Sequence, residues 1–320
     1  MTAPTQTPPA DENRVRLPGL HPTAFEHPLD RAALETLRRT PGLDLLFRKL
    51  SALHYERMVR LYFTADSLRL TPRQCPRVYQ LLRDSAGVLD MDEPDLFLAQ
   101  SPIPNAWAIG MERRTIVVTS GLVDLLSTDE LRYVIGHEMG HIKSDHMLYR
   151  TMAAFLAVVG LVAIRNLPFV NLLTQALLIA LYDWSRKSEL TADRAGLLVA
   201  QDQGVGVSAL LKLAGGARSV AEELSTEEFV KQADDLEDMG TNLLDALYLF
   251  EMTLKQTHPF PALRAREIVR WHDHGAYRQI LLGDYPRYSG EARRCARCAA
   301  PVENPLFQFC PECGARLDAE

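Results

Sequence analysis

Hydrophobic positions change their spacing along the chain, and each change predicts a different kind of element. Apolar residues recur at helical spacing from Leu34 to Arg60, with a break at Thr40-Pro41-Gly42, and again from Arg73 to Ser85. We therefore expect two helices before residue 61 and a third behind Thr71-Pro72. Helical spacing returns at Ser127 and continues to about Tyr277.

Three short segments between these helical regions are rich in β-branched and aromatic residues, and turn residues separate them. They are Asp95 to Ala99, Ala106 to Ile109 and Thr115 to Thr119. Segments of this length and composition are typical of strands. The sequence therefore predicts an α+β fold that is mostly α-helical, with a small β-sheet directly before a long helical region.

Two strongly apolar segments follow one another inside the helical region. Met152 to Ile164 contains no polar side chain, Leu167 to Tyr182 is nearly as apolar, and Arg165-Asn166 divides them. A helix that crosses a bilayer needs about 20 apolar residues, whereas the thirteen residues of the first segment rise only about 20 Å. We expect a hairpin at 152–182 that packs on protein or lies at a membrane surface. Insertion into the membrane is the alternative that its length leaves open.

The most informative stretch is His137-Glu138-Met139-Gly140-His141, which lies inside an apolar, helical run. Residues four apart share a helix face, so both imidazoles can reach one metal ion. Glu138 lies one step round the helix, where it can hold a water molecule on that ion as a general base. Two histidine ligands, a base and an open position are typical of a zinc hydrolase. Upstream, Ser127 and Glu130 have the spacing of a capping box, which predicts a helix start there.

A catalytic zinc usually has three protein ligands, so a third must come from elsewhere in the chain. Ser144 and Met147 stand where the metzincin pattern needs Gly and His, which excludes that class. His146 is five residues from His141, and on a continuous helix this spacing turns it away from the ligand face. We interpret His146 as a polar residue near a helix end.

Glu189 and Asp193 are better candidates for completing the site. They lie four apart in Ser185-Arg186-Lys187-Ser188-Glu189-Leu190-Thr191-Ala192-Asp193 and would share one helix face. Glu189 can bind the metal, and Asp193 can accept the outer N–H of a ligand histidine and so fix its orientation. Taken alone, the pair would be better explained as two solvated acids on a charged helix.

With both motifs in place, the chain resembles the gluzincin family that contains the CAAX prenyl proteases and the HtpX-type quality-control proteases. The matching segments run in the family's order between about residues 95 and 270: Asn105-Ala106, Ile116 to Leu122, His137 to His141, Ser185-Arg186 with Glu189, Ala192-Asp193, and Thr257-His258-Pro259 followed by Arg264. The resemblance implies that His137, His141 and Glu189 bind zinc, that Glu138 is the base and that Asp193 supports a ligand.

The resemblance also suggests how substrate is held. It implies that His258 lines the cleft, where it can stabilise the oxyanion. It implies that Asn105 and Ala106 lie on an edge strand, along which a polypeptide substrate adds as an extra strand; an exposed sheet edge offers unpaired backbone groups to such a peptide. Membrane members of the family have long hydrophobic spans on both sides of the metal motif, and this chain has one short hairpin. We therefore expect a soluble or peripheral protease rather than a prenyl-protein processing enzyme.

Composition and charge limit the kind of partner and the cellular compartment that we expect. The net charge of −6 argues against nucleic acid as the main partner. Met1 to Pro18 is polar and rich in proline, so it is interpreted as a disordered tail rather than an export signal. The expected location is the cytoplasm, with contact to the cytoplasmic face of the membrane through residues 152–182 left open. In a reducing compartment the five cysteines are expected to be metal ligands or free thiols.

The C-terminal region carries four of the cysteines in two C-x-x-C pairs, Cys295 with Cys298 and Cys310 with Cys313. This spacing predicts a zinc ribbon at residues 295–320, in which four thiolates hold a structural Zn²⁺. So short a segment cannot build a core, so the metal would supply its folding energy. A redox pair or two disulfides are the alternatives. Cys75 is left over, and we expect a buried free thiol there.

The sequence thus predicts a zinc metalloendopeptidase with one catalytic and one structural Zn²⁺. Its expected parts are a tail at 1–20, a peptidase domain at 21–285 divided into a helical part (21–94) and a catalytic part (95–285), a linker at 286–294, and the ribbon. The ribbon offers a surface for a protein partner. The alternative function is a latent protease that acts as a binding or chaperone-like protein through the ribbon; the complete set of ligands and base argues against it.

Overall fold

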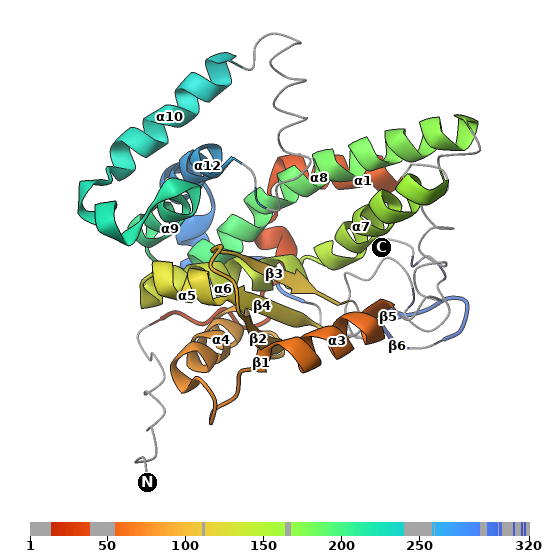
Figure 1. Ribbon diagram of the computed structural model, residues 1–320, viewed down its shortest axis with the longest axis horizontal. Helices are drawn as coiled ribbons and strands as arrows, with labels where there is room; N and C mark the ends of the chain where they lie inside the picture. The colour runs from red at the N-terminus through yellow and green to blue at the C-terminus, as the bar shows by residue number, and fades with distance from the viewer. Residues whose placement is uncertain are drawn as a thin grey trace.

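The computed structural model describes residues 14–38, 55–110, 113–163, 168–239, 258, 260–288, 293–299, 301–302, 310, 315 and 317. A small sheet lies in the middle of the molecule, with helices around it and a pair of long helices extending to one side (Figure 1). The fold is α+β and mostly helical, as the sequence predicts.

The three predicted strands are confirmed at the expected residues, as β2 (Asp95–Ala99), β3 (Ala106–Ile109) and β4 (Thr115–Thr119). A short strand that the sequence did not indicate, β1 (Leu68–Arg69), joins them. The order is β1-β2-β4-β3; β2 runs parallel to β4, whereas β3 is antiparallel to it. Every residue of β4 is buried, which fits its central place. β3 therefore lies at an edge of the sheet.

The helices before the sheet differ from the prediction in their bounds. The first, α1 (Pro28–Arg38), begins before Leu34, and α3 (Tyr55–Asp66) continues past Arg60; residues 39–54 lie outside the described part. The third helix, α4, covers Pro76–Leu89 rather than starting behind Pro72. The reason is local, because Thr71 and Gln74 form a turn closed by the Gln74 N–H donating to the Thr71 carbonyl at 3.0 Å. Pro76, in the first turn, then starts the helix.

The helices after the sheet carry the metal motif and its surroundings. They are α5 (Ser120–Leu125), α6 (Thr128–Lys143), α7 (His146–Ala163), α8 (Pro168–Ala200), α9 (Gln203–Gly215), α10 (Thr226–Met239), α12 (Pro261–His274) and α13 (Tyr277–Leu281), with a 3-10 turn at Arg218–Glu223; another 3-10 turn, Pro22–Ala24, precedes α1. The predicted capping box is present at the start of α6, because the Ser127 side chain accepts from the Glu130 N–H and the Glu130 side chain accepts from the Ser127 N–H.

Two glycines allow α6 and α8 to pack unusually close together. A Cβ atom at Gly136 would lie 2.7 Å from the Val199 Cβ, and one at Gly140 would lie 2.5 Å from the Ala195 Cβ. Real Cβ atoms do not approach so closely, so only glycine fits at this spacing. The backbone of α6 therefore lies directly against α8, which brings residues of the two helices within reach of one ion.

The apolar hairpin corresponds to α7 and the first half of α8, which run side by side away from the sheet (Figure 1). Its base is part of a buried cluster with α1, in which Leu34 and Leu37 pack with Tyr149, Met152 and Trp184. Within the described residues, no helix combines the length and apolarity that a membrane crossing requires.

Two segments expected to be irregular are built into the fold. Residues 14–20 belong to the described part, and Leu17 and Leu20 are buried in the main core, so the predicted tail at 1–20 is too long. At the other end, the predicted linker at 286–294 begins inside the domain, because the Tyr288 N–H donates to the Gly19 carbonyl and the His21 N–H donates to the Pro286 carbonyl. Backbone pairing between the two ends of the domain explains both corrections. Residues 1–13 lie outside the description.

Candidate metal centre

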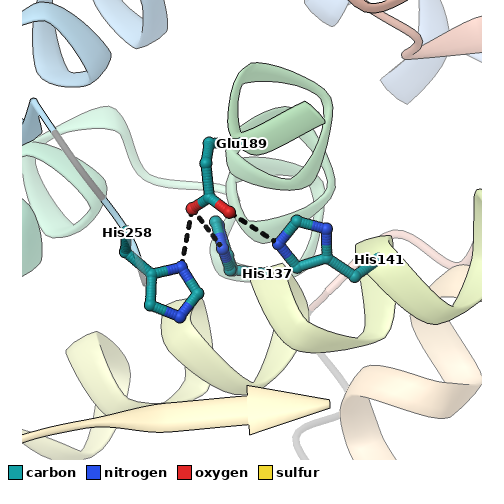
Figure 2. A group of neighbouring side chains, drawn as sticks. All are labelled: His137, His141, Glu189 and His258. Carbon is teal, nitrogen blue, oxygen red and sulfur yellow. Dashed lines mark hydrogen bonds and ion pairs between the residues drawn. The ribbon is translucent and has the colours of Figure 1, made fainter. Parts of the chain in front are cut away.

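Helix α6 presents His137 and His141 one turn apart, as their spacing predicts. Both imidazoles are buried, at 3% and 0% exposure. Helix α8 supplies Glu189, whose carboxylate faces both rings: its Oε2 lies 3.3 Å from His137 Nε2, and its Oε1 lies 3.2 Å from His141 Nε2. Figure 2 shows this carboxylate between the two histidine rings of α6 and a third ring, that of His258. The ligand atoms of all four side chains lie within 4.8 Å of one another.

The donor set fits a zinc ion. Two imidazole nitrogens and one carboxylate oxygen are the ligands of many catalytic zinc sites. Among the described residues, His137 Nε2 and Glu138 Oε2 are buried and have no hydrogen-bond partner. An unpaired buried polar atom is costly, and a metal ion with a coordinated water molecule would satisfy both atoms.

Asp193 lies where the sequence suggested, behind the first histidine. Its Oδ1 is 2.9 Å from His137 Nδ1 and accepts the Tyr133 hydroxyl at 2.8 Å. Arg264, on α12, donates to both oxygens of Asp193, at 2.6 and 2.7 Å. This arrangement directs the His137 Nε2 atom toward the metal position and holds the ring there.

Charges around the centre favour a cation. Burial by itself would raise the pKa of Asp193, but the Arg264 guanidinium and His137 outweigh burial and lower it to about 2. Burial would lower the pKa of His137, but Asp193 and Glu189 raise it to about 9. Burial would likewise raise the pKa of Glu189, which His258 and His141 hold well below its usual value. Two buried carboxylates therefore stay ionised beside the imidazoles.

His258 lies between the ligand cluster and the sheet. Its Nδ1 is 2.6 Å from Glu189 Oε2, its Nε2 is 3.0 Å from the Ala106 carbonyl oxygen, and the same Nε2 is 3.7 Å from Glu138 Oε1. Both hydrogen-bond partners are acceptors, so each ring nitrogen donates when both bonds are made. His258 thus faces the general-base candidate and the edge strand at once.

The edge strand β3 directs backbone groups toward this centre. The Asn105 carbonyl accepts from the Thr119 N–H at 3.0 Å, so this pair is hydrogen-bonded across the sheet. Ala106, the next residue, therefore points its N–H and carbonyl away from β4. By the same alternation Ala108 does so too. The Asn105 side chain accepts the Ala106 N–H at 2.9 Å. Asn105 and Ala106 thus lie on the sheet edge that faces the centre.

His146 lies at a helix end, as interpreted from the sequence, but it does not turn away from the ligand face as its spacing suggested. It is buried at 2% exposure, and its Nδ1 lies 2.9 Å from the Nδ1 of His141. The spacing argument assumed one continuous helix. Instead α6 ends at Lys143, Asp145 takes a left-handed conformation with φ of 57°, and α7 begins at His146. This break turns His146 back against His141.

Two further residues at the centre escaped the sequence analysis. Arg150, on α7, donates from Nη1 to His141 Nε2 at 2.8 Å and to Glu189 Oε1 at 3.2 Å, so its guanidinium is held by two of the atoms that a metal ion would use. Tyr133 precedes His137 by four residues on α6, and that helical spacing was a signal that could have identified it. Arg264 belonged to the matching segments, although no role followed from them.

The C-terminal cysteines form a second cluster. Cys295, Cys298 and Cys310 have their sulfur atoms within 4.8 Å of one another, and the Cys298 and Cys310 sulfurs are 3.4 Å apart. The Cys298 backbone N–H lowers the pKa of the Cys295 thiol to about 6. Two short strands, Arg293–Arg294 and Pro301–Val302, pair beside it. Cys313 lies outside the described residues. Cys75, expected to be buried, is only partly buried.

Comparison with known proteins agrees with this centre. The model of peptidase family M48 matches residues 72–272. The plastoglobule-localized metallopeptidase 48 of the Arabidopsis thaliana chloroplast is 37% identical over 80% of this chain and 74% of its own length. An HtpX protease homolog from Moorella thermoacetica is 28% identical over 50% of this chain, and one from Gemmatimonas aurantiaca is 30% identical over 49%. The chain spans 61% and 63% of the lengths of these two. No solved structure matches significantly. The chain therefore belongs to peptidase family M48, as a metallopeptidase of the HtpX type.

Proposed function

We propose that the protein is a zinc-dependent endopeptidase in which His137, His141 and Glu189 bind the catalytic Zn²⁺ and Glu138 is the general base. One observation carries the proposal: three ligand side chains from two helices converge, while the buried Glu138 Oε2 beside them has no hydrogen-bond partner among the described residues. A zinc ion bound there would lower the pKa of a coordinated water molecule and polarise the scissile carbonyl.

The protein's own groups then move one proton. The Glu138 carboxylate accepts a proton from the attacking water, whose oxygen forms a bond to the carbonyl carbon. Glu138 next delivers that proton to the amide nitrogen as the carbon–nitrogen bond breaks, so the amine leaves neutral. The Nε2 atom of His258, 3.7 Å from Glu138 Oε1, would turn its N–H from the Ala106 carbonyl to the developing oxyanion.

We propose that substrate binds as an extra strand along β3. The outward backbone groups of Ala108 can pair with an extended peptide, and those of Ala106 can do so once the peptide displaces the Asn105 side chain and His258 from them. Such pairing reads backbone rather than side chains, so it favours unfolded or extended polypeptides of varied sequence. This fits a role in protein quality control or processing.

Glu138→Gln tests the proposed chemistry. The amide keeps the size of the side chain but cannot take the proton, so hydrolysis of an unfolded protein such as casein should fall below detection while zinc content stays at the parent level. The exposed Glu35, changed in the same way, is the matched control. Full activity in Glu138→Gln would refute the assigned base. Comparing new N-termini in cells that carry the parent or Glu138→Gln would identify substrates.

We further propose that the cysteine cluster is a zinc ribbon completed by Cys313, which gives a second, structural Zn²⁺ and a surface for a protein partner. Four thiolates would close the coordination shell, so no catalysis is expected there. Elemental analysis of the purified protein should find two zinc ions per chain. One ion would contradict either the ribbon or the catalytic site.

Residues 152–182 are the proposed point of membrane contact for a protein of the cytoplasm. The base of the hairpin packs on α1 through Met152, Leu181 and Trp184, whereas Ile179 is half exposed. Fractionation followed by carbonate extraction tests the proposal. Release by carbonate would support surface attachment, full solubility would support a hairpin packed on protein, and a pellet that needs detergent would show insertion.

A further inference from the structure

A chain of hydrogen bonds leads from the second metal-ligand candidate to the N-terminal helix. His141 Nδ1 lies 2.9 Å from His146 Nδ1, and His146 Nε2 lies 3.1 Å from Asp30 Oδ2. All three side chains are buried, with exposures of 0%, 2% and 0%. They come from three elements, α6, α7 and α1, so the chain is a product of the tertiary fold.

Donor and acceptor rules fix the direction of this chain. A guanidinium can only donate, so Arg150, 2.8 Å from His141 Nε2, requires a lone pair on that nitrogen. In the neutral ring the hydrogen of His141 is then on Nδ1, and it is donated to His146 Nδ1. His146 therefore carries its own hydrogen on Nε2 and donates it to Asp30. A metal ion at His141 Nε2 selects the same arrangement of hydrogens.

Asp30 is built to remain an anion at the end of the chain. The Trp184 indole N–H donates to its Oδ1 at 2.8 Å, and the Thr191 hydroxyl donates to its Oδ2 at 2.5 Å. With His146 this gives three donors to one buried carboxylate. A buried charge is tolerated when it is paired and hydrogen-bonded in this way.

We propose that His146 and Asp30 are positioning residues of the metal centre, which hold His141 with Nε2 directed at the ion. The inference rests on the proposed zinc site. The two histidines would then be supported differently: His137 by a carboxylate directly, and His141 by a carboxylate acting through a second imidazole. Asp30 also lies outside residues 72–272, so the N-terminal helix α1 adds to the centre a group beyond the segment that matches the family model.

The consequence is measurable as metal affinity, because partners of ligand histidines typically change affinity by about 10–100-fold. His146→Leu fills the site with an apolar side chain and leaves the His141 Nδ1–H without an acceptor. His146→Asn places an amide oxygen near the position of Nδ1 and restores an acceptor. We therefore expect His146→Leu to bind zinc about 10–100-fold more weakly than the parent, and His146→Asn to recover most of the loss.

The order of the two variants separates positioning from packing. His146 is surrounded by Trp184 and His141, so a merely structural role would favour Leu over Asn in a buried place. Zinc affinity is measured by competition with a chelating dye, and unfolding of the metal-free proteins by denaturant. A higher zinc affinity in His146→Asn than in His146→Leu supports the proposal, whichever of the two variants is more stable. The proposal is overturned if His146→Leu binds zinc as tightly as the parent, or if His146→Leu binds zinc more tightly than His146→Asn.

Controls keep this result distinct from the function proposed above. The zinc ion whose binding disappears in Glu189→Ala belongs to this centre, and if none disappears the centre itself is wrong. Asp30→Asn should weaken that same ion, whereas Asp183→Asn, whose side chain is 43% exposed on α8, should not. His272→Leu and His272→Asn, at a solvent-accessible histidine, should leave zinc affinity unchanged. Loss in Asp183→Asn equal to that in Asp30→Asn would also overturn the proposal.

Discussion

Replacing Gly140 with alanine tests whether the close packing of α6 on α8 builds the metal centre. Gly140 lies next to His141 on α6, and α8 carries Glu189. An alanine Cβ at this position would be 2.5 Å from the Ala195 Cβ and 3.1 Å from the Ala192 Cα. Neither atom is the end of a flexible side chain, so the two helices must move apart.

The expected magnitude combines two opposing effects. Alanine is favoured over glycine inside a helix by about 1 kcal/mol, and forcing an extra methyl group into a packed interior costs about 1–3 kcal/mol. Gly140→Ala should therefore lower the free energy of unfolding by an amount between zero and about 2 kcal/mol. Because the shift separates His141 from Glu189, zinc affinity should fall as well.

Gly87→Ala is the matched control. Gly87 also lies in a helix, α4, but a Cβ there would meet its nearest neighbour, the Arg16 side chain, at 3.8 Å, an ordinary contact. Its expected effect is a gain of up to about 1 kcal/mol with no change in zinc binding. The difference between the two variants cancels helix propensity and leaves the packing cost of about 1–3 kcal/mol. Denaturant unfolding and zinc competition measure both quantities.

A compensating change makes the test sharper. Ala195→Gly removes the nearest contact, so the double variant Gly140→Ala with Ala195→Gly should be more stable than the sum of the two single changes predicts. If Gly140→Ala were as stable as Gly87→Ala and bound zinc like the parent, α6 and α8 would not pack as described here. An additive double variant would also contradict the reasoning.

Other predictions follow from single contacts. Glu189→Ala should lose both zinc binding and peptidase activity, and full zinc occupancy on elemental analysis would mean that the third ligand lies elsewhere. Asp193→Asn should weaken zinc binding by about 10–100-fold in a chelator competition; an unchanged affinity would make Asp193 a structural acid only. Cys310→Ser should lower the zinc count by one while peptidase activity persists, and loss of activity would tie the ribbon to catalysis. Burial alone would raise the pKa of Glu130 above 4.5, but hydrogen bonds from Lys212, Ser208 and Ser127 lower it below that value. The ionised carboxylate therefore stabilises the fold above about pH 4.5, and this stabilisation is lost as the pH falls through the lower folded-state pKa. Glu130→Gln, which keeps a side chain able to cap α6, should therefore be less stable than the parent at neutral pH, and the gap in denaturant midpoint should close in acid; a gap that persists there would contradict the assignment.

The spacing of residues along the chain was sufficient to predict the structure wherever a single helix or strand defines which side chains share a face. The helical period alone places His137 and His141 on one face of α6 and Glu189 and Asp193 on one face of α8. Short β-rich segments separated by turn residues likewise predicted β2, β3 and β4 at their observed residues. These features depend on backbone geometry within a few residues, and that geometry is the same in every protein.

Prediction failed where a short break or a distant partner intervened. The left-handed residue Asp145 ends one helix and redirects His146, although the hydrophobic pattern runs on across it. Buried Leu17 and Leu20 look like parts of a polar tail until residues 286–288 pair with that segment. Helical spacing cannot predict either feature, because both depend on residues that are not part of a regular helix.

The sequence by itself identified the candidate donor residues of the proposed metal centre and their order along the chain. Only the tertiary structure decided which groups lie behind Asp193 and His141: Arg264 comes to Asp193 across 71 positions of sequence, and Asp30 reaches the centre through His146 from the N-terminal helix. Gly136 and Gly140 have no visible role until α8 lies against α6. The physical reason is the distance along the sequence over which each effect acts. Helix periodicity involves neighbouring residues, whereas close packing and the pairing of buried charges depend on how segments far apart in the sequence meet.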